Sequence, residues 1–282
     1  MKDFGFIPID DRTLARVSLV QKIVAVISIL AFTQSGLFPT GISIFGSPTV
    51  MDGGCFKLQD YLGRKVTTTE KVLFNFMLYL PFIIQHMTMS RMWFKETMQR
   101  MWRNYVFYER ILFNLVTSIL LFMMSWFFQA DDKMIFEVKF PFASFIWMSI
   151  SILALVLWVW SLADMSPDDV FCFGLLKEWK KNKGSRFPAS IDSETQSILS
   201  LSCRFPHFFA ILVFNIFGPT VYTATRLGHM ITMEVFTYMG TLLEERCLKT
   251  IPGYSDYMKA TPNRFIPDIR VWFRGSKVAK KE

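Results

Sequence analysis

Long apolar segments alternate with shorter polar stretches along this chain. Six of them come close to the roughly 20 residues that a helix needs to cross a bilayer. They lie at about 17–38, 72–90, 108–128, 140–163, 205–222 and 228–247. No connecting stretch is long enough to form a separate soluble domain. We therefore predict one all-α membrane domain of six transmembrane helices, with an N-terminal helix and loop (1–71), a helical core (72–268) and a basic tail (269–282).

Charged residues are concentrated in the connections between these segments. The connections 91–105 and 164–204 are rich in Lys and Arg, whereas 129–139 carries Asp131 and Asp132. If all six segments span, both basic connections and both termini fall on one side, which the positive-inside rule assigns to the interior. We expect that side to face the cytosol, matrix or stroma, in a mitochondrial inner membrane or in the endoplasmic reticulum or nuclear envelope.

The composition supports a membrane protein over a nucleic-acid-binding one. The chain is 52% hydrophobic and 19% charged, against about 45–50% and 25% in soluble domains. Its net charge of +8 comes from residues at the ends of apolar segments, so we expect a lipid bilayer as partner and no nucleic acid. The four cysteines have no CxxC spacing, which argues against a zinc site or a disulfide framework.

The last two apolar segments are predicted to form a tight hairpin, because Gly218-Pro219 interrupts the chain between them. Arg204 then begins the first helix and Glu244 ends the second, so both lie at the basic end of the hairpin. Further polar residues follow within reach of that end, namely Tyr254, Tyr257 and Arg264.

The stretch from Arg204 to Pro267 resembles the C-terminal region of membrane methyltransferases of the isoprenylcysteine carboxyl methyltransferase type. Their pattern reads R-H-P-x-Y-x-G, then a hydrophobic hairpin, then E-E-R-x-L and Y-x-x-Y. The matching residues occur in the same order here: Glu244, Glu245, Arg246, Leu248, Tyr254, Tyr257 and Pro267. The resemblance implies a pocket for S-adenosylmethionine.

Further motifs resemble the NnrU, nurim and methanethiol S-methyltransferase branch of this superfamily. Its Q-H-S-x-M-A-R-x-x-F-K, E-R, D-L-F-G-L-x-x-x-W, T-P-T and G-H elements have counterparts in order. These are Gln85-His86 with Met89 and Phe94-Lys95, then Glu109-Arg110, Phe171 to Trp179, Gly218 to Thr220 and Gly228-His229. The resemblance extends from about residue 72 to residue 268.

One element departs from the family pattern. The family's R-H-P-x-Y-x-G, which helps to form the S-adenosylmethionine pocket, reads R-F-P-H-F-F-A from Arg204 to Ala210. Phenylalanine cannot form a side-chain hydrogen bond, so a buried ligand group facing it would lose a partner, at about 1–3 kcal/mol per group. His207 lies two positions after the replaced histidine and does not share its helical face.

The family match assigns six candidate cofactor-binding residues: Arg204, Glu244, Glu245, Arg246, Tyr254 and Tyr257. A carboxylate would meet the cationic part of the methyl donor, and an arginine would bind its carboxylate in a bidentate manner. Alternatively, the same charges form an ion cluster at headgroup level where a helix ends. No catalytic residue is assigned.

His86 has two interpretations. Some NnrU-like relatives carry haem, which would make His86 an iron ligand; otherwise it is a hydrogen-bonded histidine in the helix interior. His229 is expected at least roughly 15 Å away along the helix axes, too far to share one iron with His86. Glu234 lies inside the last apolar segment, where a carboxylate needs a partner or a proton.

Three functional hypotheses follow. The first is a structural or accessory subunit of a membrane complex with an eroded S-adenosylmethionine site and no cofactor. The second is an active S-adenosylmethionine-dependent methyltransferase acting on a thiol, carboxylate or lipid. The third is an NnrU-like protein that binds haem b through His86.

Overall fold

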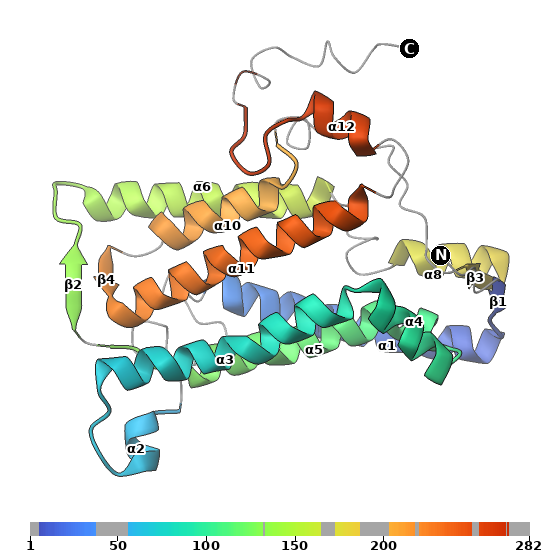
Figure 1. Cartoon of the computed structure of the whole chain (residues 1–282), viewed down its shortest axis with the longest axis horizontal. Coiled ribbons are helices and arrows are strands. Elements are labelled where there is room, and N and C mark those ends of the chain that lie inside the picture. The colour runs from blue at the N-terminus through green and yellow to red at the C-terminus, as the bar shows by residue number, and fades with distance from the viewer. Residues whose placement is uncertain are drawn as a thin grey trace. The chain divides into compact units, whose positions relative to one another are not determined.

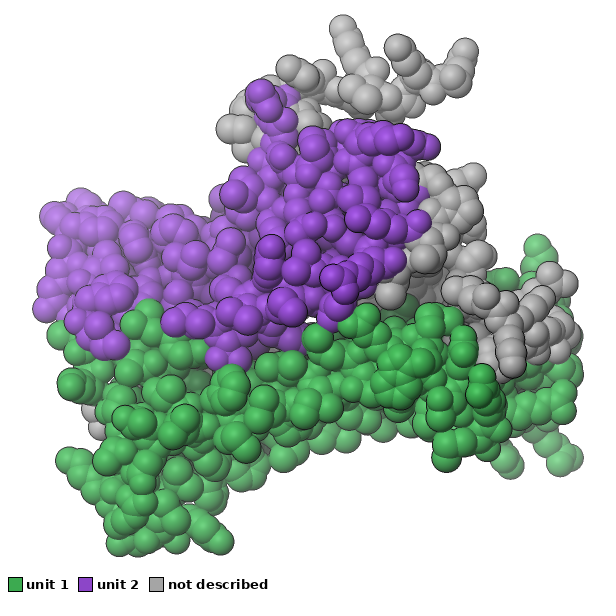
Figure 2. Space-filling view, viewed as in Figure 1, with its two compact units in different colours: residues 1–134, 167–191, 223–229 green, residues 135–166, 192–222, 230–282 purple. Residues whose placement is uncertain are grey.

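The computed structural model describes residues 6–37, 56–131, 133–164, 173–186, 203–217, 220–249, 254–268 and 270. The described chain is mostly helical, with two short two-stranded sheets, β1–β3 and β2–β4 (Figure 1). It divides into two compact units, coloured separately in Figure 2. The single membrane domain expected from the sequence stays a prediction.

Unit 1 comprises residues 1–134, 167–191 and 223–229. Its elements are β1 (Phe6–Pro8), α1 (Asp11–Leu37), α2 (Leu58–Leu62), α3 (Thr68–Met89), α4 (Met92–Met101), α5 (Tyr105–Phe127), α8 (Phe173–Asn182), β3 (Gly184–Arg186) and the first turns of α11 (Ala224–Leu248). Unit 2 comprises residues 135–166, 192–222 and 230–282. It contains most of β2 (Met134–Glu137) and β4 (Val221–Thr223), the rest of α11, and α6 (Ala143–Asp164), α10 (Pro206–Phe217) and α12 (Tyr254–Ala260).

Four helices are long and apolar enough to cross a membrane. The qualifying segments are Asp11–Ala31, Thr68–Met89, Tyr105–Phe127 and Ala143–Ser161. They agree closely with the first four apolar segments of the sequence, and they indicate an α-helical integral membrane protein. Their surfaces are largely exposed and apolar, as a lipid environment requires.

The prediction of six spans is not confirmed for the last two segments. α10 and α11 do form there, but α10 has 12 residues and is about 18 Å long, short of the roughly 30 Å hydrocarbon core. α11 has 25 residues, yet Arg226, Glu234 and the charged triplet 244–246 lower its hydropathy. The two predicted segments are therefore helical, but α10 is too short and α11 too polar to qualify as membrane spans.

In unit 1, α1 and α3 both pack against α5. α1 runs in the same direction as α5, because Val17 and Phe107 share a core near their beginnings and Ser118 Oγ donates to Ser28 Oγ (3.0 Å) further along. α3 runs in the opposite direction, since Thr117 Oγ1 donates to Gln85 Oε1 (3.3 Å) and α3 begins near the end of α5. The start of α1, the end of α3, α4 and α8 therefore share one end of the unit.

This arrangement agrees with the charge pattern of the sequence for unit 1. The stretch 91–105 and residues 173–186 lie at the same end as the start of α1. The structure adds that both stretches contain helices, α4 and α8, which the hydropathy pattern left as connections. Both are short and amphipathic, so their apolar residues are too few for a span.

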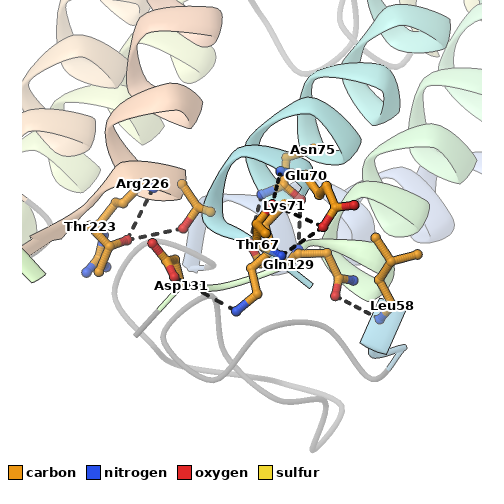
Figure 3. A network of polar contacts seen from close by, with 10 residues as sticks. Leu58, Thr67, Glu70, Lys71, Asn75, Gln129, Asp131, Thr223 and Arg226 are labelled. Atoms are coloured by element: carbon orange, nitrogen blue, oxygen red, sulfur yellow. Dashed lines mark hydrogen bonds and ion pairs between the residues drawn. The ribbon is translucent and has the colours of Figure 1, made fainter. Parts of the chain in front are cut away.

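A buried amide network occupies the other end of unit 1 (Figure 3). Asn75 Nδ2 donates to the carbonyl of Gln129 (2.8 Å), and the Gln129 backbone N–H donates to Asn75 Oδ1 (2.7 Å). The Gln129 side chain donates to the carbonyls of Phe56 and Phe127 and accepts from the backbone N–H of Leu58. These bonds join the start of α3, the end of α5 and the segment before α2.

The beginning of α3 is determined locally by a capping box. Thr67 Oγ1 accepts from the backbone N–H of Glu70 (3.3 Å), and Glu70 Oε2 accepts from the backbone N–H of Thr67 (2.9 Å). Arg64 pairs with the same carboxylate. This arrangement satisfies N–H groups that have no partner within the helix.

In unit 2, α6 packs against α10. Ser151 Oγ donates to the carbonyl of Phe217 (2.8 Å), and the rings of Trp147 and Phe217 meet edge to face at 5.2 Å. The ring of Phe136 stacks on that of Tyr222 at 4.2 Å, where β2 pairs with β4. These contacts anchor the beginning of α6 to the chain that follows α10.

We predict that Asn75→Ala destabilises the protein by about 2–4 kcal/mol. The substitution leaves the buried N–H and C=O of Gln129 without their side-chain partner, at roughly 1–3 kcal/mol per group. Thermal or denaturant unfolding in mild detergent measures the effect. Thr69→Ala on the exposed face of the same helix is the control, and equal stability of the two variants would contradict the proposed role of the network.

Candidate functional site

A charged cluster in unit 2 brings together three segments that are distant in sequence. Arg204 immediately precedes α10, Glu245 lies in the last turn of α11, and Arg264 follows α12. The predicted proximity of Arg204 to the acidic end of the second hairpin helix is therefore confirmed. We call these three residues the Arg–Glu–Arg clasp.

Both oxygens of the Glu245 carboxylate are bound by arginines. Arg204 Nε and Nη2 each lie 2.8 Å from Oε1; Arg264 Nε donates to Oε1 (3.1 Å) and Nη2 to Oε2 (2.6 Å). The pairing of Arg264 is thus bidentate, the geometry that gives charge-assisted hydrogen bonds their specificity. The Glu245 and Arg204 side chains are only 4% and 6% exposed, whereas that of Arg264 is 28% exposed.

Arg204 also binds the backbone of the segment after α12. Its Nη1 donates to the carbonyls of Thr261 (2.9 Å) and Pro262 (2.8 Å). The backbone N–H groups of Arg204 and Phe205 donate to the carbonyls of Asn263 and Arg264, each at 3.0 Å. The segment 261–264 is therefore held along the chain that leads into α10, through side chain and backbone together.

The electrostatics of the clasp favour the ionised carboxylate. Burial raises the pKa of the Glu245 carboxyl, but hydrogen bonds from Arg264 and Arg204 outweigh burial and hold the pKa below its ordinary value. The pKa of Arg264 is raised, chiefly by its hydrogen bond to Glu245. Two guanidinium groups around one carboxylate leave one positive charge in excess, on a cluster that is largely buried.

Tyr254 and Tyr257 lie on α12 with their rings 5.7 Å apart. Burial raises the pKa of Tyr257 to about 12, with Tyr254 and Cys203 adding to the increase and Arg204 opposing it. The tyrosine pair therefore adjoins the clasp, as the sequence predicted. At neutral pH the Tyr257 hydroxyl is therefore protonated.

The remaining predicted site residues contribute less to the cluster. Arg246 is exposed on the last turn of α11. The side chain of Glu244 lies outside the part of the chain that the structure describes. The acidic pair of the family pattern is therefore represented in the clasp by Glu245.

Apolar packing occupies the positions where this chain departs from the family pattern. Phe205 is 3% exposed, and its ring lies 5.8 Å from that of Phe208 and 6.4 Å from that of Phe265. Ala210, where the family has glycine, is fully buried. The described side chains at the three replaced positions thus pack within the protein.

His86 lies on α3 between aromatic rings in unit 1. Its ring is 5.6 Å from that of Phe82 and 4.9 Å from that of Phe113. Among the described residues, no group of three or more His, Cys, Asp or Glu side chains is arranged to hold a metal ion. The side chain of His207 lies outside the described residues.

His229 contacts a different part of α3. Its Nδ1 forms a hydrogen bond with the Tyr79 hydroxyl, and its ring lies edge to face with that of Phe128 at 6.1 Å. Tyr79 precedes His86 by two helical turns, or roughly 10 Å. The two histidines therefore contact different turns of α3, in line with the expectation that they do not share one iron atom.

Glu234 forms a hydrogen bond with a polar side chain. Its Oε1 accepts from Asn215 Nδ2 (3.1 Å), and both residues belong to unit 2. The bond joins the last turn of α10 to the middle of α11. It satisfies the expectation that a carboxylate in this apolar segment requires a partner.

Sequence reasoning missed the backbone acceptors of the clasp. The carbonyls of Thr261 and Pro262 bind Arg204, and a backbone carbonyl carries no residue-specific signal. Arg264 was placed within reach but not assigned to the site, because the family pattern names E-E-R and Y-x-x-Y only. A buried carboxylate needs an opposite charge, and this requirement is the signal that could have assigned Arg264 to the site.

No family model matches this sequence, and the searches of curated proteins and of solved structures return no match either.

We predict that Glu245→Gln destabilises the protein by about 3–5 kcal/mol, because it leaves the buried guanidinium of Arg204 and the partly exposed one of Arg264 without their counter-charge. Denaturant unfolding in mild detergent measures the loss. Asp256→Asn is the matched control, since it removes a carboxylate from the exposed pair with Lys259 and should change stability by at most about 1 kcal/mol. Equal effects of the two variants would refute a structural role for the clasp.

The clasp also predicts a pH dependence. A carboxyl whose pKa is lowered on folding stabilises the protein above its unfolded pKa, about 4.5 for glutamate, and this stabilisation is lost as the pH falls through the folded pKa. The difference in unfolding free energy between wild type and Glu245→Gln should therefore be constant near neutral pH and shrink below about pH 4.5. Unfolding curves of both proteins between about pH 3 and pH 7 test this dependence. A difference in unfolding free energy that stays constant over this range would contradict it.

Proposed function

We propose that this chain is an integral membrane protein in which a methyltransferase-like pocket has become a structural clasp. It would serve as a structural or accessory subunit of a membrane complex, and its basic end would face the cytosol, matrix or stroma. The observation that carries the proposal is the closed pairing of Arg204, Glu245 and Arg264.

The pairing leaves little capacity for a cofactor at the two most buried charges. In the pocket that the resemblance implies, a carboxylate and a guanidinium would be directed at S-adenosylmethionine. Here both Glu245 oxygens accept from arginines, and Arg204 donates to Glu245 and to the carbonyls of Thr261 and Pro262. A ligand that replaced these bonds would first have to break a buried ion pair, which costs several kcal/mol.

The apolar replacements support the same proposal. Phe205 and Phe208 stand where the family has polar side chains, and they pack against each other and, through Phe205, against Phe265. Such packing stabilises the segment before α10 and offers no hydrogen bond to a polar ligand. The exposed apolar faces of the spanning helices suit contact with lipid and with the helices of partner subunits.

An active methyltransferase is the second candidate, because one feature of the clasp favours it. The cluster carries one more guanidinium than carboxylate, and Arg264 is the more exposed arginine. The carboxylate of S-adenosylmethionine could meet this excess positive charge, with Tyr254 and Tyr257 nearby. The acceptor would then be a thiol, carboxylate or lipid that reaches the headgroup level.

We predict that the protein purified in mild detergent migrates with other subunits, well above the monomer in its micelle. We also predict no saturable binding of S-adenosylmethionine up to about 1 mM, the upper end of common KM values, and no Soret band. Native electrophoresis, equilibrium dialysis with labelled S-adenosylmethionine and absorbance spectroscopy provide the readouts.

The other outcomes identify the alternatives. Saturable binding of S-adenosylmethionine that the Tyr254→Phe/Tyr257→Phe variant weakens, and that the exposed Tyr61→Phe does not, would support the enzyme. A stoichiometric Soret band lost in His86→Ala would support the haem protein. Either result would overturn the proposed subunit role of an eroded site.

A further inference from the structure

A groove of about 360 Å³ lies between α1 and α8 in unit 1. It is lined by Leu14, Ser18, Phe173, Leu176, Lys177 and Lys180. Its volume falls in the range of sites that hold small molecules, roughly 300–1,000 Å³. None of its residues belongs to the Arg–Glu–Arg clasp, so the inference drawn from it does not depend on the proposed function.

The groove combines an apolar floor with a basic rim. Leu14 and Ser18 are four positions apart on α1, and the lining residues of α8 follow the i, i+3, i+4, i+7 spacing of one helical face. Along this face, the apolar Phe173 and Leu176 come first and the basic Lys177 and Lys180 follow. The acidic residue of α8, Glu178, is exposed and does not line the groove.

α8 is held firmly against the start of α1. Trp179 on its other side is buried and meets the ring of Phe107 edge to face at 4.9 Å. After α8, β3 pairs with β1 in antiparallel fashion, and the Ile9 backbone N–H donates to the carbonyl of Lys183 (2.9 Å). The groove is therefore a built feature of unit 1, fixed by contacts on both sides of α8.

The groove lies at the beginning of a membrane-spanning helix. The candidate span of α1 starts at Asp11, so Leu14 and Ser18 lie roughly 4.5 and 10 Å along its axis. This is the level at which phospholipid headgroups meet their acyl chains. Arg12 and Arg16 on α1 and Lys181 on α8 are exposed at the same end and add positive charge.

We propose that this groove binds an anionic phospholipid. An acyl chain lies on Leu14, Phe173 and Leu176, and the ammonium groups of Lys177 and Lys180 bind the phosphate of the headgroup. Long lysine side chains can keep their stems on apolar surface while the charged ends reach the headgroups. Basic pockets beside transmembrane helices bind anionic lipids in this way, and each basic residue near the surface strengthens binding about fivefold.

The test uses the full chain reconstituted in phosphatidylcholine bilayers. Electron paramagnetic resonance measures the association of spin-labelled phosphatidylglycerol relative to spin-labelled phosphatidylcholine. We expect the wild type to prefer phosphatidylglycerol and Lys177→Gln/Lys180→Gln to lose most of that preference, by up to about thirtyfold at low ionic strength. Charge-neutral glutamine at these exposed positions should leave the fold intact.

Two further variants make the test specific for the groove. Lys65→Gln/Lys133→Gln removes the same charge from exposed residues that precede α3 and follow α5, at the other end of unit 1, and should keep the preference. Ser18→Phe keeps both lysines but fills the groove, and it should lower the preference for phosphatidylglycerol. The proposal is overturned if the wild type shows no preference, if both lysine pairs act equally, or if Ser18→Phe has no effect.

Discussion

The carboxylate of Glu245 determines how the C-terminal part of unit 2 is organised. It lies at the end of α11 and accepts hydrogen bonds from Arg204, before α10, and from Arg264, after α12. An isolated charge at this depth would be strongly disfavoured. Its burial is possible because two segments far apart in the chain each supply a guanidinium. The same two segments also pair through their backbones, residues 204–205 with 263–264.

Neutral buried polar groups play a comparable role in unit 1. The Asn75–Gln129 network and the bonds between Ser28 and Ser118 and between Gln85 and Thr117 lie within a bundle of apolar helices. In an apolar environment such bonds select one register of the helices, because any shift leaves polar groups without partners. The two units therefore share one constraint: a polar group buried among apolar helices, whether charged or neutral, needs a polar partner.

The candidate site could be predicted in part. A helical hairpin predicts that Arg204 lies beside the acidic end of α11, with Tyr254 and Tyr257 near them, because helices joined by a short connection return to the same end. It could not predict that Glu245 would be saturated by two arginines, since side-chain pairing depends on where residues 261–264 lie. The resemblance named Arg204 and Glu245 as candidates, but the pairing of Arg204 with the carbonyls of Thr261 and Pro262 has no counterpart in a motif.

The sequence alone determined the four long apolar helices and their approximate limits, because hydrophobic length is a local property that any window of the chain reveals. It overestimated the hairpin as two further spans, since α10 is short and α11 carries charges whose effect depends on their partners. Only the tertiary structure decided that α4 and α8 fold as amphipathic helices, that α8 and α1 enclose a groove, and that three distant charges become one cluster. These features arise from contacts between segments far apart in the chain, and no local pattern encodes the geometry of such contacts.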